Sequence, residues 1–264
     1  GGLRPAAGPG FRRWPRKAGI RRGILRNYCA GRGPRGPDSR IALKKKNRMR
    51  GKRSTEEYTA PVEDYLKTIY ELERISGAAM TNDIAGRLSV APASVSGMVR
   101  RLADQGLLEH EKYKGVRLTE EGRRIALGTI RRHRVIETYL TKRLGYPWDM
   151  VHEEAERLEH AASDELINRM AAALGEPTVD PHGAPIPTRE GEIHEGETTT
   201  IADLAEGESA RIVRVSDDNP ELLRYLDEIG LTLGTGITLV SRAPFDGPLF
   251  LRIERDGECG ERAI

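Results

Sequence analysis

Apolar side chains recur at helical spacing along the chain from Thr59 onwards. Residues 61–75 predict an amphipathic helix that begins at Pro61, a residue type favoured in the first helical turn. Two shorter helices follow at 81–89 and 93–105, with Val90, Ala91 and Pro92 as the tight turn between them, and residues 107–118 predict two strands around a basic turn. A helix-turn-helix followed by a hairpin predicts a winged helix that binds DNA. An unrelated small helical core is the alternative.

The stretch 119–174 predicts helix almost throughout. Thr119 is placed to cap its start, Gly145 ends the first segment, and a second helix is expected from Asp149 and Met150 to Leu174. Its apolar stripes exceed what a small domain can cover, so we expect a homodimer interface. A dimer also suits the two half-sites that helix-turn-helix proteins read.

The pattern changes after Gly175. Residues 176–199 are rich in Pro, Gly and Glu and predict a linker, in which His182 and His194 are expected not to be metal ligands. Residues 200–264 predict short strands around one helical turn. We expect this last domain to be truncated, or its tail GECGERAI to be irregular.

Charge separates the first part of the chain from the remainder. Residues 1–53 hold 18 Lys and Arg side chains and one acid, Asp38, whereas the whole chain of 264 residues carries only +3. This basic leader is rich in Gly and Pro and is expected to be disordered. We expect Met49 to be an alternative start, which would make 1–48 translated upstream sequence; a nucleic-acid-binding arm is the alternative.

Composition narrows the class of protein further. No run of 18 apolar residues is present, so no membrane span is expected. Cys29 and Cys259 lie far apart without a CxxC spacing, which favours a protein of the reducing cytoplasm. We assign 54–124 to DNA binding and 125–175 to dimerisation and metal binding.

Potential metal ligands are concentrated in the segment VHEEAERLEH. On a continuous helix, where each residue turns by about 100°, His152, Glu156, Glu159 and His160 would share one face. His152 and His160 would be roughly 12 Å apart along the axis, too far for one ion. Two sites are therefore expected, one with Glu156, Glu159 and His160 and help from another helix. The other combines His152 with His133 and Glu137, one helical turn apart. A solvated acidic face is the alternative.

The motifs VEDYLKTIYELE (62–73), IRRHRVIETYL (130–140), VHEEAERLEHAASDEL (151–166) and DPHGAPIP (180–187) together resemble the diphtheria toxin repressor family, and within it the manganese-dependent branch. The resemblance covers roughly 59–260. It implies a mainly α fold with a small β part: a winged helix-turn-helix, an all-α dimerisation and metal-binding domain, and a C-terminal SH3-like barrel similar to the FeoA-like iron-transport accessory proteins.

The resemblance also implies ligands. The primary site falls on Asp64, Glu156, Glu159 and His160, and the ancillary site on His133, Glu137 and His152. Asp64 and Glu156 stand where the iron-responsive branch has Met and Cys, and oxygen donors favour Mn²⁺. Lys67 stands where binuclear manganese regulators have a further carboxylate, which favours two separated sites. Asp217, Asp218, Asn219 and Glu221 lie near a loop that donates ligands in some relatives.

The expected DNA-reading positions lie at the start of the second short helix and in the wing. Those for base contacts are Ala91, Pro92, Ala93, Ser94, Ser96 and Gly97. Those for phosphate contacts are Arg100, Arg101, Lys112, Lys114 and Arg117; a solvated charge is the alternative for each.

The resemblance implies a cytoplasmic homodimeric repressor that binds double-stranded operator DNA when Mn²⁺ fills its sites and so controls manganese uptake genes. Fe²⁺ and iron uptake genes are the alternative, and a DNA-binding module with purely structural metals is a second. No membrane and no small-molecule substrate other than the metal ion is expected. An enzymatic di-iron or hydrolytic centre is disfavoured because paired Glu-x-x-His motifs are absent.

Overall fold

A computed structural model describes residues 58–111, 115–216, 219–245, 247–255 and 258–264. The expectations for the leader and Met49 lie outside these residues, as do Lys112, Lys114, Asp217 and Asp218. No helix among the described residues combines the length and the apolar character needed to span a membrane.

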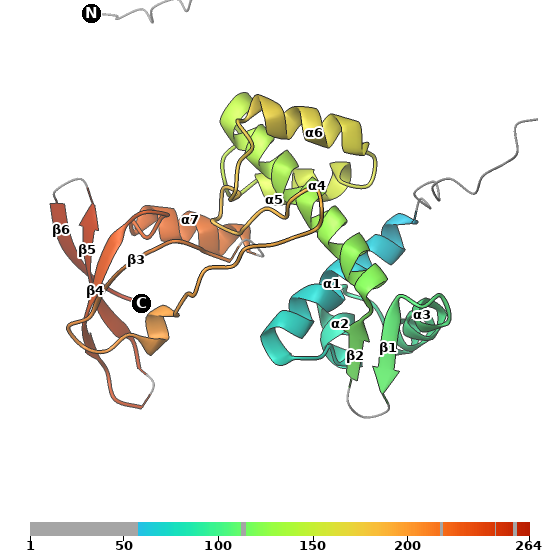
Figure 1. The fold of residues 1–264 in the computed structure, drawn as a ribbon. Coiled ribbons are helices and arrows are strands. Elements are labelled where there is room, and N and C mark those ends of the chain that lie inside the picture. Colours follow the sequence, from blue (N-terminus) through green and yellow to red (C-terminus); the bar gives the residue numbers. More distant parts are fainter. Residues whose placement is uncertain (1–57, 112–114, 217–218, 246, 256–257) are drawn as a thin grey trace, which may run out of the picture. The chain divides into compact units, whose positions relative to one another are not determined.

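The first part of the described chain consists of three helices and a hairpin. These elements are α1 (Ala60–Ser76), α2 (Thr81–Arg87), α3 (Pro92–Asp104), β1 (Leu108–Glu111) and β2 (Gly115–Leu118) (Figure 1). α1 ends at Gly77, whose left-handed φ of 75° suits glycine. Leu66, Ile84 and Leu102, one from each helix, are fully buried in a shared core. The expected winged helix-turn-helix is confirmed.

The long helix α4 (Glu120–Leu144) connects this domain to the next one. It begins as expected, with the Thr119 hydroxyl accepting a hydrogen bond from the Gly122 N–H at 3.1 Å. Ile130 packs in the winged-helix core, whereas Val135 and Leu140, farther along, pack in a second core. One rigid helix of roughly 37 Å therefore passes through both domains.

The continuous helix expected after residue 150 is wrong. The structure has two helices, α5 (Val151–Leu158) and α6 (Asp164–Ala173), separated by a turn. The Ser163 hydroxyl accepts a hydrogen bond from the Leu166 N–H and so caps the start of α6. In a continuous helix this N–H would instead bond a backbone carbonyl one turn earlier. Glu159 and His160 consequently lie at and beyond the end of α5.

The C-terminal part is a small antiparallel sheet with one helix. Its elements are β3 (Ser209–Arg211), α7 (Pro220–Glu228), β4 (Gly236–Arg242), β5 (Leu249–Arg255) and β6 (Glu258–Ala263), with the strands in the order β3-β4-β5-β6. Alternate residues of β4 and β5, among them Leu239 and Leu251, are fully buried. Of the two alternatives expected here, a truncated domain or an irregular tail, the second is wrong, because the tail forms β6, which pairs with β5 along its length.

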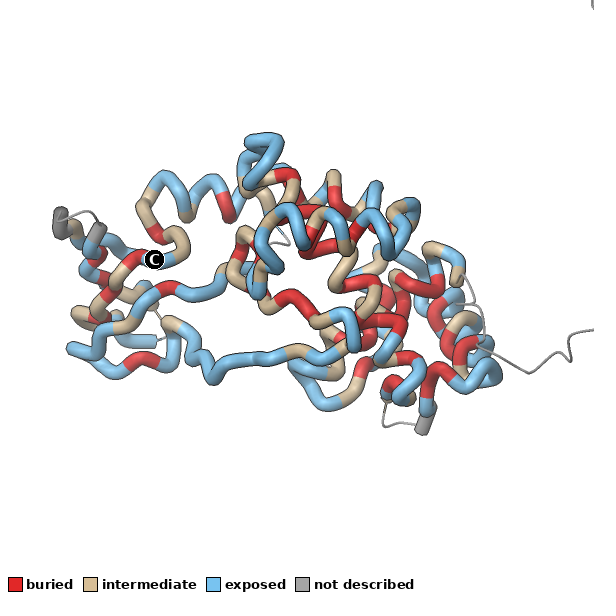
Figure 2. The backbone as a smooth tube through the Cα atoms, turned by 45° about the horizontal axis from the view of Figure 1, so that its top comes forward, coloured by how far each residue is buried: buried red, intermediate tan, exposed pale blue. Residues whose placement is uncertain are grey.

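The first half of the expected linker packs against α4. Arg131 donates to the Pro187 carbonyl at 2.7 Å and Arg134 to the Pro185 carbonyl at 2.5 Å. Asp180 and His182 are buried, while residues from Glu195 to Thr200 are exposed. Buried and exposed stretches of the backbone are distinguished in Figure 2.

Candidate metal centre

Three segments bring carboxylates and imidazoles together. Asp64 comes from α1, His133 and Glu137 from α4, and the remaining residues from α5 and the turn after it. Each packs there for an ordinary reason: α1 and α4 share the winged-helix core, and α4 and α5 share the second core. The apolar packing of α4 on both sides thus fixes where the polar residues between the two cores converge.

The first group is Asp64, Glu159 and His160, whose ligand atoms lie within 4.8 Å of one another. His160 Nε2 is 2.8 Å from Asp64 Oδ1 and 3.5 Å from Glu159 Oε1. Burial raises the pKa of Asp64 even though His160 opposes the shift. Glu159 is fully buried; burial favours its neutral form, but His133 and Lys67 outweigh it and lower its pKa. Anionic oxygens around an imidazole nitrogen suit a divalent cation.

Glu63 supports this group and was not foreseen from the sequence. Its Oε2 lies 2.6 Å from His160 Nδ1, and its other oxygen accepts from Arg132. A carboxylate at Nδ1 holds the proton there and leaves Nε2 as the ligand atom, the arrangement common behind metal-bound histidines. Glu63 is only 9% exposed although it is charged, a property that the structure shows and the sequence does not.

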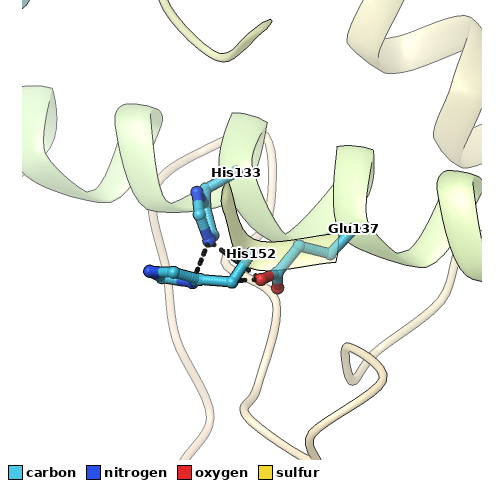
Figure 3. A group of neighbouring side chains, drawn as sticks. All are labelled: His133, Glu137 and His152. Carbon is cyan, nitrogen blue, oxygen red and sulfur yellow. Dashed lines mark hydrogen bonds and ion pairs between the residues drawn. The ribbon is translucent and has the colours of Figure 1, made fainter. Parts of the chain in front are cut away.

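The second group is His133, Glu137 and His152 (Figure 3). His133 Nε2 lies 3.0 Å from Glu137 Oε1 and 3.1 Å from His152 Nδ1, and His152 Nδ1 lies 3.3 Å from the same Glu137 oxygen. His133 and Glu137 project from successive turns of α4 toward His152. Two ring nitrogens and one carboxylate oxygen, each 3.0–3.3 Å from the others, can bind the same cation.

The surroundings of the second group favour the protonated form of His133 and the ionised form of Glu137. Burial and Lys67 oppose the charged form of His133, but Glu137 and Glu159 outweigh them and raise its pKa to about 9. Burial opposes the ionised form of Glu137 in turn, yet His133 outweighs it and lowers the pKa of that carboxyl strongly. The Nδ1 of His133 is 2.5 Å from Glu159 Oε2, so a residue of the second group contacts a residue of the first.

Glu156 is the expected primary ligand that the structure leaves apart from Asp64. It belongs to a third group of ligand atoms, with His133 and Glu159, that lies between the other two. Its Oε1 accepts from the Lys67 ammonium at 2.6 Å. Its side chain is 41% exposed, so it can rotate toward Asp64 without disturbing the core.

The motif DPHG (180–183) lies next to the buried carboxylate of Glu137. His182, expected not to be a metal ligand, is fully buried with Nδ1 3.9 Å from Glu137 Oε2, and its Nε2 donates to the Trp148 carbonyl at 2.7 Å. Asp180 Oδ1 accepts from the His182 and Ala184 N–H groups. His194, by contrast, is exposed. Pro-rich surroundings and distance in sequence concealed the role of His182 at the sequence level.

The expected DNA-reading positions lie on the solvent-facing side of α3 and at its start. All six positions expected to contact bases are exposed, as are Arg100, Arg101 and Arg117. Val95, Val99 and Leu102 fill the opposite face and are buried. The two faces of α3 are thus separated into a packed side and an available side.

Three protein-family models match consecutive parts of the chain, in the same order as the three domains described above. Residues 57–116 match the N-terminal DNA-binding domain of iron-dependent repressors, 119–188 their metal binding and dimerisation domain, and 199–259 the FeoA domain.

Solved structures of related proteins share the fold. A manganese-dependent transcriptional repressor in complex with manganese superposes with a TM-score of 0.70 at 38% identity, over 76% of this chain and 94% of that one. The manganese regulator SloR gives 0.65 at 36% identity, over 77% and 92%.

Relatives by sequence include iron-dependent repressors and diphtheria toxin repressors. The iron-dependent repressor IdeR of Mycobacterium tuberculosis is 40% identical over 125 residues, which are 47% of this chain and 54% of that protein, so the match spans about half the relative's length. The diphtheria toxin repressor of Corynebacterium efficiens is 34% identical over 191 residues, 68% of this chain and 82% of that protein. The chain therefore belongs to the diphtheria toxin repressor family.

Proposed function

We propose that the protein is a cytoplasmic, metal-dependent repressor of transcription that binds double-stranded operator DNA as a homodimer when Mn²⁺ fills two sites. The observation that carries this proposal is the cluster of carboxylates and imidazoles linking α1 of the winged helix to α4 and α5. A ligand set that spans two domains can change how the domains are held, whereas a set within one domain could only stabilise it.

The donor sets fit a divalent cation. We assign Asp64, Glu156, Glu159 and His160 to the primary site and His133, Glu137 and His152 to the ancillary site. A bound ion would supply concentrated positive charge to these groups. With the ion bound, Asp64 would connect α1 to the end of α5, and Glu63 would orient His160. Glu159 accepts a hydrogen bond from His133, so binding at one site would affect binding at the other. By linkage, operator DNA must tighten metal binding by the same factor that metal tightens DNA binding.

The dimer and the DNA surface follow from exposed side chains. Large apolar residues remain exposed around α4, α5 and α6, and these are Leu144, Tyr146, Met150, Leu158 and Leu166. A second copy covering them would place two α3 helices for two half-sites. The small residues at the start of α3 favour readout by methyl contacts, Ser hydroxyls and DNA shape.

Manganese is preferred over iron because three of the four residues assigned to the primary site, Asp64, Glu156 and Glu159, offer carboxylate oxygens and none offers sulfur. Iron is the second candidate because IdeR and related proteins carry iron in their names. Intrinsic affinity ranks Mn²⁺ below Fe²⁺, so selectivity for manganese would depend on geometry and on the ions available. Control of manganese uptake genes follows from this choice of ion.

Selectivity can be tested with sulfur donors. The duplex is selected from a random-sequence library with Mn²⁺ present, and its binding is titrated anaerobically with Mn²⁺ and with Fe²⁺. The double variant Asp64→Met, Glu156→Cys should shift the preference toward Fe²⁺, while Arg157→Met, which alters only exposed pairs on α5, should not. An unchanged preference in the double variant would count against the donor argument. Loss of helical structure on metal removal would instead identify the metals as structural.

A further inference from the structure

Lys67 is a cation in the middle of the ligand cluster. It projects from α1, and its Nζ lies 2.6 Å from Glu156 Oε1, 3.1 Å from Glu159 Oε2 and 3.3 Å from His133 Nδ1. Its side chain is 12% exposed. These three neighbours form the middle group of ligand atoms, so an ammonium lies in contact with every member of a group that could otherwise hold a metal ion.

The ammonium is held in its charged form. Lysine is charged at neutral pH, and the Lys67 Nζ lies within hydrogen-bond distance of the carboxylates of both Glu156 and Glu159. A charged group in this position has two effects on an incoming ion. It donates hydrogen bonds to oxygens the ion needs, and it repels the ion as a like charge in a partly buried, weakly screened environment.

Lys67 also links the same elements that the metal is proposed to link. Its contacts with Glu156 and Glu159 connect α1 to the end of α5, beside the contacts of His160 with Glu63 and Asp64. Binding at the primary site therefore exchanges one cation for another, and does not assemble a site from separated parts. For Glu156 the exchange requires rotation from Lys67 toward Asp64.

We propose that Lys67 is a tethered competing cation that sets the metal concentration at which the centre responds. This inference rests on the proposed metal-sensing function and concerns the threshold of that function. Lys67 is thus a positioning residue that competes with metal ions for the carboxylates of Glu156 and Glu159. An ion displaces the ammonium only when it also binds Asp64 and His160.

The test measures Mn²⁺ binding to the full chain by isothermal titration calorimetry, without DNA. Replacing Lys67 by the unbranched, neutral Met should tighten the higher-affinity site about tenfold, since the competing charge is gone while the side-chain length is kept. Lys67→Arg keeps the charge and should stay within about threefold of the unmodified protein. Arg74→Met removes a cation from the same helix, where it pairs with Glu195, and should leave Mn²⁺ affinity unchanged.

Two further measurements guard against a folding defect. Lys67→Gln is neutral but can still donate to one carboxylate, and should also tighten binding. In the unmodified protein, Cd²⁺ should shift the Nζ resonance of Lys67 in an NMR titration, because the ammonium must leave its two carboxylates. Affinity that is equal or weaker in folded Met and Gln variants would overturn the inference, as would a Lys67 resonance that ignores Cd²⁺.

The two proposals fail in different ways. If the unmodified protein binds no divalent ion, both the metal-sensing function and the role of Lys67 are wrong. If it binds Mn²⁺ and its Met and Gln variants bind no more tightly, the metal-sensing function stands and the role of Lys67 is wrong.

Discussion

The ancillary group should bind metal more tightly as pH rises, because His133 must lose a proton first. In the metal-free protein its ring is charged, with Nδ1–H directed at Glu159 and Nε2–H at Glu137. The pKa of about 9 lies two units above pH 7. Removing that proton at pH 7 costs about 2.7 kcal/mol, at about 1.4 kcal/mol per unit, which lowers metal affinity about 100-fold.

The assay isolates the ancillary group in a chain carrying Asp64→Ala, which weakens the primary group. Mn²⁺ affinity is measured anaerobically between pH 6.5 and 8.5, in pairs of buffers with different ionisation enthalpies. We expect affinity to rise about tenfold per pH unit, with about one proton released per ion. Adding His133→Gln should remove most of this slope. Affinity that stays constant over this range, with no proton release, would refute the reasoning.

The same group should make the metal-free protein sensitive to alkali. Because the pKa of His133 is raised on folding from its usual 6.5 to about 9, its charged form stabilises the fold fully below pH 6.5. That contribution, about 3 kcal/mol, is lost as pH rises through 9. Urea unfolding of the metal-free chain at pH 6.5 and 9 should show the loss, and His133→Gln should reduce it. Equal loss in both chains would contradict this account.

Four further substitutions test the residues that support the centre and the packing of α4. Glu63→Gln should weaken primary-site Mn²⁺ binding 10-fold or more in calorimetry, since the carboxylate behind His160 is lost; an unchanged affinity would argue against that role. Gly122→Ala should lower the free energy of unfolding by at least about 2 kcal/mol in thermal melts, because a Cβ there would overlap the carbonyl oxygen of the residue before β1. Gly128→Ala, in open space on the same helix, should instead stabilise by up to about 1 kcal/mol. Asp180→Ala should cost about 2–4 kcal/mol in urea unfolding, because two buried N–H groups lose their acceptor, and a smaller effect would show that water replaces it.

Helical periodicity predicted the winged helix and α4 well because these elements rest on local signals. Thr119 caps α4 as its residue type suggested, and Gly77 and Gly145 end helices with left-handed φ angles. The break between α5 and α6 was missed because residues 159–162 have helix-compatible side chains. Only the capping hydroxyl of Ser163 marks the new start, and a Ser in a helical pattern is a weak signal.

Spacing and the family resemblance predicted the candidate ligand residues, and they remain predictions; the residues that contact them from behind were not predicted. Spacing on one segment and the family resemblance suggested His133, Glu137 and the acidic segment 151–160. Glu63 and His182 act through contacts between residues 97 and 45 positions apart in sequence, which no local pattern encodes. Lys67 was noticed as an obstacle to a binuclear site; its position among three ligands required the packing of α1 on α4 and α5.

The most direct test of the central claim is reciprocal linkage between metal and DNA. Operator affinity is measured by fluorescence anisotropy with saturating Mn²⁺ and with chelator, and Mn²⁺ affinity is measured with and without the operator duplex. The account predicts at least about a tenfold gain in operator affinity with metal, and the same factor in metal affinity with DNA. Operator affinity that is equal with Mn²⁺ and with chelator would contradict it.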